Sequence, residues 1–177
     1  MAAILAFAGS NSSTSINFKL VELTTSLVQN HDLQTLNMAE HPFPMFSEDL
    51  EREKGYPDAL TGLKDQIAQA DGIILSVNEH NGNPSAYFKN LLDWLSRLER
   101  NFLEGTKVFL MSTSGGKRGA KGSLVVIESM LPRFGAEIVA TFSLPSFYDN
   151  FSEDGILDED LKTGHQHALQ TFLDSLN

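Results

Sequence analysis

A short apolar run at the start of the chain leads into a hydroxyl-rich turn and then a helical pattern. Residues 3–8 are all apolar, and a continuous run of this length that ends at a turn is typical of a strand buried on both faces. Residues 9–17 hold one glycine followed almost entirely by serine, threonine and asparagine. Apolar residues at helical spacing come next, at Ile16, Leu20, Leu23 and Leu27. This pattern predicts a strand that passes through a polar turn into a helix.

The turn at residues 9–17 is suited to bind an anion. The first N–H groups of a helix lack backbone partners, the helix dipole adds about half a positive charge, and hydroxyl side chains add donors. We interpret the turn as a phosphate-binding loop, and an ordinary strand–helix turn capped by serine or threonine is the alternative. It has neither the lysine of a P-loop nor the second and third glycines of a dinucleotide fingerprint. A terminal phosphate held without metal, as in a mononucleotide, therefore fits best.

Strand and helix patterns alternate along the rest of the chain. An alternation of this kind predicts a parallel sheet with helices on both faces. We expect one α/β domain over residues 1–177, with a three-layer, doubly wound, flavodoxin-like five-stranded sheet in the order 2-1-3-4-5. Further strands are expected at 32–37, 72–77, 107–111 and 137–142, and further helices at 58–70, 85–98, 124–134 and 161–176.

Three polar loops follow expected strands 1, 3 and 4, at residues 9–17, 78–85 and 112–123. In doubly wound sheets, ligands bind beyond the carboxyl ends of the strands, where the strand order reverses. The three loops could therefore line one site.

Composition narrows the possible chemistry. The absence of cysteine excludes disulfides, thiolate catalysis and cysteine-ligated metal centres. The formal net charge of −10 disfavours nucleic acid as a partner.

His165 and His167 are two positions apart on an expected helix and point in different directions, so no metal site is expected. The apolar start lacks a basic region and is too short to span a membrane, so we expect a cytoplasmic protein without a membrane partner.

The order and spacing of several short motifs resemble the NAD(P)H-dependent FMN reductases of flavodoxin-like fold, relatives of the chromate, azo and quinone reductases. The resemblance covers nearly the whole chain. It implies FMN as cofactor, NADPH or NADH as co-substrate, a small-molecule electron acceptor, no catalytic side chain, and a homodimer or homotetramer. The motifs are Gly9-Ser10 with Ser15 and Asn17, Ala70-Asp71-Gly72, Glu79 with Asn81, Lys89-Asn90, Asp93-Trp94, and Ser114-Gly115-Gly116.

The resemblance assigns cofactor-binding residues in three loops. The FMN phosphate would be held by the first loop, and the isoalloxazine ring would lie along the second with its other edge against the third. The residues so implied are Gly9, Ser10, Ser12, Ser15, Ile16 and Asn17, then Asn78, Glu79, His80 and Asn81, then Ser114, Gly115, Gly116 and Lys117.

The chain departs from the family pattern in each of these loops. Ser12 stands where the family commonly has an arginine, and Asn78-Glu79-His80-Asn81 replaces the usual Pro-Glu-Tyr-Asn. The third loop is more basic than usual, so Lys117 or Arg118 could supply charge for the phosphates of the nicotinamide nucleotide.

An FMN-dependent NAD(P)H oxidoreductase with ping-pong kinetics is the expected function. A flavodoxin-type electron carrier is one alternative, but carriers usually sandwich the ring between aromatic side chains and the ring loop offers only His80. A flavin-free scaffold of the same fold is the other alternative. A phosphoacceptor receiver domain is excluded because Ala8-Gly9-Ser10 stands where it needs a carboxylate pair.

Overall fold

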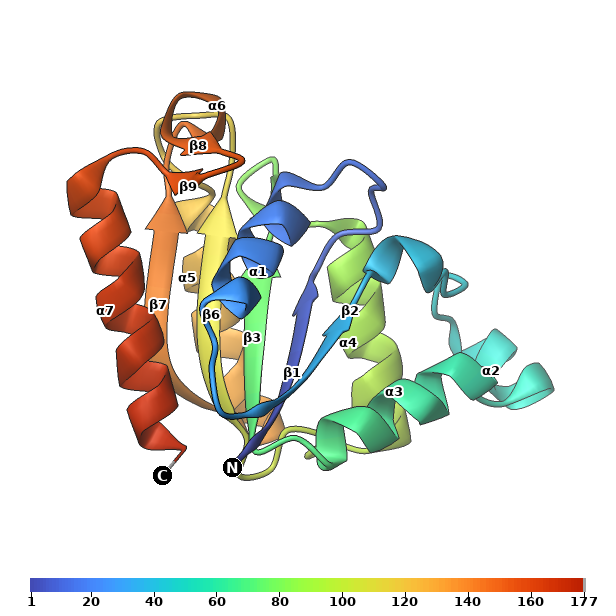
Figure 1. Cartoon of the computed structure of the whole chain (residues 1–177). Helices are drawn as coiled ribbons and strands as arrows, with labels where there is room; N and C mark the ends of the chain where they lie inside the picture. The colour runs from blue at the N-terminus through green and yellow to red at the C-terminus, as the bar shows by residue number, and fades with distance from the viewer. Residues whose placement is uncertain (177) are drawn as a thin grey trace.

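A computed structural model describes residues 1–176 of the chain. Its centre is a five-stranded sheet in the order β2-β1-β3-β6-β7, in which every neighbouring pair is parallel. Figure 1 shows this sheet with helices on both sides. The expected doubly wound, flavodoxin-like order is therefore confirmed. The strands are β1 (Ala3–Ala8), β2 (Asp32–Leu36), β3 (Gly72–Val77), β6 (Lys107–Thr113) and β7 (Glu137–Leu144), with two small pairs, β4 (Glu79–His80) with β5 (Asn83–Pro84) and β8 (Phe151–Ser152) with β9 (Gly155–Ile156).

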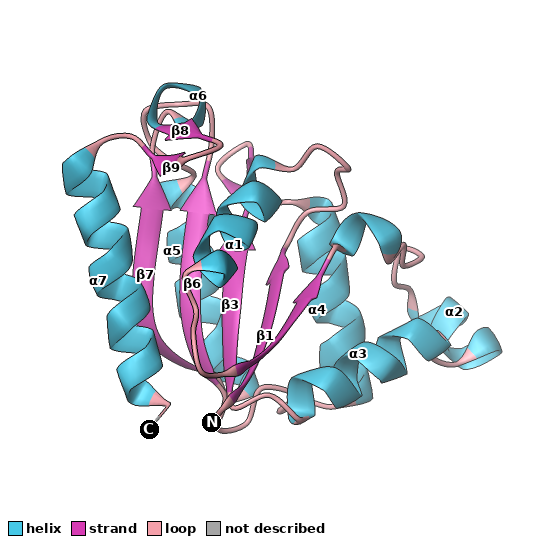
Figure 2. Cartoon of the chain, viewed as in Figure 1, coloured by secondary structure: helices cyan, strands magenta, loops and turns pink. Residues whose placement is uncertain are grey.

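Two helices cover one face of the sheet and three cover the other (Figure 2). On the first face α1 and α7 pack against Ile4 and Ala6, and on the second α3, α4 and α5 pack against Leu5 and Phe7. Successive residues of a strand point to opposite faces, so the single apolar run of β1 supplies both cores. The helices are α1 (Ile16–Ser26), α2 (Glu48–Lys54), α3 (Asp58–Ala68), α4 (Ala86–Leu98), α5 (Lys121–Met130), α6 (Phe147–Asn150) and α7 (Glu159–Ser175), with 3-10 turns η1 (Met38–Glu40) and η2 (Leu131–Phe134).

Three sequence expectations about element bounds and faces were wrong. Strand β6 continues to Thr113 and α5 begins at Lys121, so the loop between them is shorter than the expected 112–123. Leu27 follows the end of α1 and is 42% exposed, because the buried face of this helix is formed by Leu20, Val21 and Thr24. Between the last strand and the last helix, where the sequence predicts no element, the structure has α6 and the β8–β9 hairpin.

The long proline-containing segment after β2 is held against α4 by polar contacts. Asn90 accepts a hydrogen bond from the Phe46 backbone N–H at 2.7 Å and donates to the carbonyl of Pro44 at 3.0 Å. The indole N–H of Trp94 donates to the same carbonyl at 2.8 Å, and the Trp94 side chain is fully buried. Trp94 is thus a packing residue that fastens this segment to the domain.

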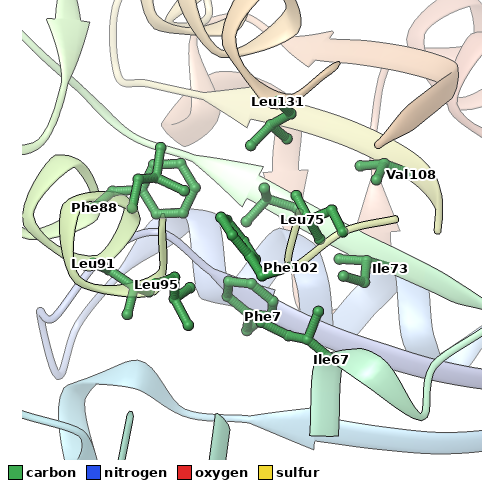
Figure 3. A pocket seen from close by; sticks show the side chains of 12 residues that line it. Phe7, Ile67, Ile73, Leu75, Phe88, Leu91, Leu95, Phe102, Val108 and Leu131 are labelled. Carbon is green, nitrogen blue, oxygen red and sulfur yellow. The ribbon is translucent and has the colours of Figure 1, made fainter. Parts of the chain in front are cut away.

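The core between the sheet and α4 contains a small cavity of about 20 Å³ (Figure 3). Twelve apolar side chains line it, among them Phe7, Phe88 and Phe102. A buried water needs polar partners, so we expect this cavity to be dry. A ligand that carries phosphate must bind elsewhere. Within residues 1–176, no helix is both long enough and apolar enough to cross a membrane.

Candidate functional site

A polar cavity of about 290 Å³ lies at the carboxyl ends of β1, β3 and β6. Neighbouring β1 and β3 are connected in opposite directions along the sheet, the position at which doubly wound folds bind ligands. The three expected loops therefore do meet in one place, at the upper end of the sheet in Figure 1. The lining residues are Ser10, Asn11, Ser12, Thr14, Ser15, Ile16, Asn17, Asn78, Glu79, His80, Thr113, Ser114, Gly115 and Tyr148.

The loop after β1 presents hydrogen-bond donors to this cavity. Ser15 caps α1, because its hydroxyl accepts from the Phe18 N–H at 3.2 Å and its carbonyl accepts from Lys19 N–H. The N–H groups of Ile16 and Asn17, in the same helical turn, have no partner within residues 1–176. Ser12 is exposed, with its hydroxyl 3.3 Å from that of Thr14. Backbone and hydroxyl donors thus converge at a helix N-terminus, the arrangement that binds phosphate without a cation.

Asn17 holds the site together through its side chain. Its carbonyl oxygen accepts from the Ser76 hydroxyl at 2.8 Å and from the Thr113 N–H at 3.0 Å, and its amide donates to the Thr113 carbonyl at 3.1 Å. These bonds join α1 to the ends of β3 and β6, and Asn17 is only 2% exposed. The side-chain oxygen is therefore occupied, and Asn17 can offer a ligand its backbone N–H and the second N–H of its amide.

Gly9 lies next to the cavity without lining it. A β-carbon at this position would be 2.8 Å from the ring of Phe88, so only glycine allows α4 to pack this closely against the end of β1. The Gly9 carbonyl accepts from the Ser85 hydroxyl at 2.9 Å, and the same hydroxyl caps α4 by accepting from Phe88 N–H. Gly9 is placed here by packing.

The turn after β3 forms a second wall of the cavity. The side-chain oxygen of Asn78 is buried and has no hydrogen-bond partner within the described chain. A buried acceptor without a partner at a cavity wall is satisfied when a ligand supplies an N–H or O–H donor. His80 is exposed with Nε2 3.3 Å from the Asn78 amide nitrogen, whereas Asn81 lies at the tip of the β4–β5 turn and outside the lining.

Glu79 of the same turn occupies the N-terminus of another helix. Its Oε2 accepts from the Ser123 N–H at 2.9 Å, in the first turn of α5. The capping residue of α5 is Ala120, which has no side chain that could do this. A carboxylate already neutralises the start of α5, whereas the start of α1 remains free for an anion.

The loop after β6 brings Ser114 and Gly115 to the cavity but not Gly116 or Lys117. The Gly116 carbonyl accepts from Ser146 N–H at 2.9 Å, and the Ser114 carbonyl accepts from Phe147 N–H at 3.0 Å. Lys117 is exposed and is not among the lining residues of the cavity. The loop is therefore fixed to the start of α6.

Tyr148 of α6 is a lining residue that sequence reasoning missed. It is 76% exposed, and its ring lies against Gly115, where a β-carbon would be 3.1 Å from Cε2. The signal in the sequence was the aromatic cluster at 147–151, which pattern alone could not place beside a loop more than thirty residues earlier.

Comparison with known proteins agrees with this geometry. The family described as NADPH-dependent FMN reductase matches residues 2–149. The quinone reductase of Escherichia coli (strain K12) is 37% identical over 76 residues, which are 43% of this chain and 40% of that protein. The NADPH:quinone oxidoreductase of Arabidopsis thaliana is 30% identical over 122 residues, which are 67% of this chain and 61% of that protein. The matched segments thus span less than two thirds of these relatives.

Two solved structures share the fold over almost their whole length. A flavoenzyme NAD(P)H:(acceptor) oxidoreductase from Paracoccus denitrificans superposes with a TM-score of 0.79 at 23% identity, over 99% of this chain and 97% of that one. An apo NADH:FMN oxidoreductase gives a TM-score of 0.81 at 21% identity, over 100% of this chain and 91% of that one. At these identities the likeness establishes the fold.

Proposed function

Because the chain belongs to the NADPH-dependent FMN reductase family, we propose that it binds FMN in the cavity at the carboxyl ends of β1, β3 and β6. There it catalyses NAD(P)H-dependent reduction of a small acceptor of the quinone or azo class. The observation that carries the proposal is the open N-terminus of α1, which lies in the wall of the cavity together with several hydroxyl side chains. Quinone reductases among the relatives support the acceptor class.

The residues of the first loop fit the phosphate of FMN. The backbone N–H groups of Ile16 and Asn17 and the hydroxyls of Ser12 and Thr14 face the same cavity. No lysine or arginine is among its described lining residues. In this proposal the helix dipole and neutral donors hold the phosphate. They take the place of the arginine that the family commonly has at the position of Ser12.

The residues of the second and third loops fit a flat, polar-edged ring. Asn78 offers its unpartnered buried oxygen to a donor on the ring, and Ser114 and Gly115 present a wall with little side chain. When bound, FMN supplies the redox chemistry, accepting a hydride from the nicotinamide and delivering two electrons to the acceptor. The chain itself contributes orientation and exclusion of water, and no acid or base among its side chains is required.

The proposal extends to three properties that accompany this family assignment. The chain acts as one domain over residues 1–177, as a homodimer or homotetramer, and in the cytoplasm. Exposed apolar side chains outside the cavity, Val125 at 62% and Met45 at 69%, are available for contacts between subunits.

The test is an anaerobic titration followed by turnover. Purified protein is mixed with FMN, freed of excess flavin, and treated with NADPH, and we expect the visible flavin band to bleach and to return when a benzoquinone is added. Steady-state NADPH oxidation should depend on both FMN and quinone. Absence of flavin-dependent NADPH oxidation would overturn the enzyme proposal, and flavin binding without turnover would indicate an electron carrier instead.

A further inference from the structure

Tyr148 is an aromatic side chain held in the open at the rim of the cavity. It is 76% exposed, and its hydroxyl makes no hydrogen bond within residues 1–176. An aromatic ring is usually buried because contact with water is unfavourable for its faces. A ring left exposed beside a ligand cavity has its apolar surface available to a ligand.

The position of this ring is fixed by the chain around it. The N–H groups of Ser146 and Phe147 are bonded to the carbonyls of Gly116 and Ser114, at 2.9 and 3.0 Å. Phe147 is buried and meets Tyr148 edge-on, with ring centroids 5.7 Å apart, and stacks on Phe151 at 4.5 Å. Tyr148 is thus mounted on a rigid base, so that little conformational entropy is lost when a ligand packs on it.

Tyr148 also borders a second, larger hollow. A groove of about 630 Å³ runs between α1 and the α6–β8 segment, and it is lined by Lys19, Leu23, Phe151 and others. Tyr148 is the residue that lines both the cavity and this groove. The Tyr148 ring is therefore accessible both from the groove and from the cavity.

The residues that line the cavity differ in how exposed they are. Ser10, Asn17 and Thr113, which lie at the ends of the strands and at the start of α1, are 6%, 2% and 1% exposed. These residues suit a cofactor that stays bound. Tyr148 is far more exposed and borders the groove as well, which suits contact with a substrate that binds and leaves at each turnover.

We propose that Tyr148 is a substrate-contacting, specificity-determining residue that stacks on the ring of the planar electron acceptor, of the quinone class. This inference rests on the proposed function, because it places the acceptor on the outer side of FMN. The ring of Tyr148 provides the contact, and its hydroxyl is dispensable. An aromatic pair is expected to change the affinity for the acceptor about three- to tenfold.

The test compares Tyr148→Ala and Tyr148→Phe with the matched control Leu157→Ala. Leu157 is an exposed apolar residue, 54% exposed, in the same connection and outside the lining of the cavity. For each variant the Kd for FMN, the KM for a naphthoquinone, the KM for ferricyanide and the sedimentation coefficient are measured. Ferricyanide serves as an acceptor without an aromatic ring.

We expect Tyr148→Ala to raise the KM for the quinone about three- to tenfold, with the Kd for FMN and the KM for ferricyanide unchanged. Tyr148→Phe and Leu157→Ala should behave like the unmodified protein. A rise in the Kd for FMN would make Tyr148 a cofactor contact, a changed sedimentation coefficient would make it a subunit contact, and an unchanged quinone KM would remove any role. Each of these overturns the proposal. If the unmodified protein does not bind FMN, the proposed function fails instead.

Discussion

Glu79 accepts a hydrogen bond from the backbone N–H of Ser123 at 2.9 Å, across 44 residues of sequence. The bond joins the β4–β5 turn to the start of α5. The β4–β5 turn forms one wall of the cavity, and the loop just before α5 forms another wall. Ala120, the capping residue of α5, has a left-handed backbone with φ of 61° and no side-chain oxygen. Glu79 therefore caps the N-terminus of α5, although it lies in a distant part of the sequence.

Removal of this contact should affect both stability and ligand binding. We expect Glu79→Ala to lower the free energy of unfolding by about 1 kcal/mol, the usual effect of losing a cap. It should also weaken FMN binding about three- to tenfold, because the turn that carries Asn78 loses an anchor. Glu79→Gln keeps an acceptor and should recover most of both effects. Urea unfolding and flavin titration measure these changes, with Glu128→Ala on the exposed face of α5 as control.

Two helical glycines should respond in opposite ways to replacement by alanine. A β-carbon at Gly122 would lie 2.6 Å from Glu79 Oε2 and 3.0 Å from the carbonyl of Gly82, whereas one at Gly62 in α3 would have nothing within 4 Å. Gly62→Ala should raise the free energy of unfolding by about 0.5–1 kcal/mol through helix propensity. Gly122→Ala should lower it by about 1–2 kcal/mol because the β4–β5 turn is pushed away. Equal responses in urea unfolding would show that the close contact between turn and helix does not exist in solution.

Asn17 should behave as a structural residue in a binding assay. Asn17→Ala leaves the Ser76 hydroxyl and the backbone groups of Thr113 without their partner, and we expect a loss of about 2–3 kcal/mol in the free energy of unfolding. Affinities for FMN and for riboflavin should fall by the same factor, since the bonds that are lost join α1 to Ser76 and Thr113 and involve no ligand. Asn101→Ala, at an exposed site, should change neither quantity. A selective loss of FMN affinity would instead assign the side chain of Asn17 to the phosphate.

His165 is buried between α7, α1 and the sheet. It is 1% exposed and contacts the rings of Phe109 and Phe142. The Thr24 hydroxyl donates to the Leu20 carbonyl at 2.7 Å, so His165 Nε2 must donate to Thr24 across their 2.9 Å contact. Burial lowers the pKa of His165 from 6.5 to about 4, which keeps the ring neutral in the folded protein.

This histidine should make the protein less stable in acid. Between pH 6.5 and about 4 the unfolded chain binds a proton at His165 that the folded chain does not, so the free energy of unfolding falls as the pH falls, by up to roughly 3 kcal/mol. The slope should flatten in His165→Leu, measured as Tm against pH. His167→Leu, at an exposed position two residues further along α7, should keep the slope of the unmodified protein. An unchanged slope in His165→Leu would assign the acid sensitivity to other groups.

The sequence predicted the sheet and the position of the cavity because those depend on local patterns. The apolar runs at β1, β3 and β6 are typical of buried strands, and in a parallel sheet the polar loops at their carboxyl ends lie at the same edge. It did not predict what individual polar side chains do. The family resemblance implies that Gly9 and Asn17 bind the cofactor, but the contacts of these residues with Phe88 and Thr113 depend on the packing of distant elements.

Tyr148 and Glu79 also have contacts that sequence patterns do not predict. Tyr148 comes to the cavity because backbone bonds fasten α6 to the loop after β6, a pairing with no signature in the chain. The sequence predicts the loop in which Glu79 lies but not its bond to α5. The capping residue of that helix is Ala120, whose left-handed backbone is not predicted by helix or capping propensities. Side-chain roles that arise from long-range packing require the structure.

The central claim is that the start of α1 binds the phosphate of FMN, and comparison of FMN with riboflavin tests it most directly. The two ligands share the ring and differ in the phosphate, so quenching of flavin fluorescence is titrated with each. We predict that FMN binds at least about tenfold more tightly, and that the double variant Ser12→Ala, Thr14→Ala reduces this preference while leaving riboflavin affinity unchanged. Equal affinity for the two flavins, or no binding of either, would contradict the account.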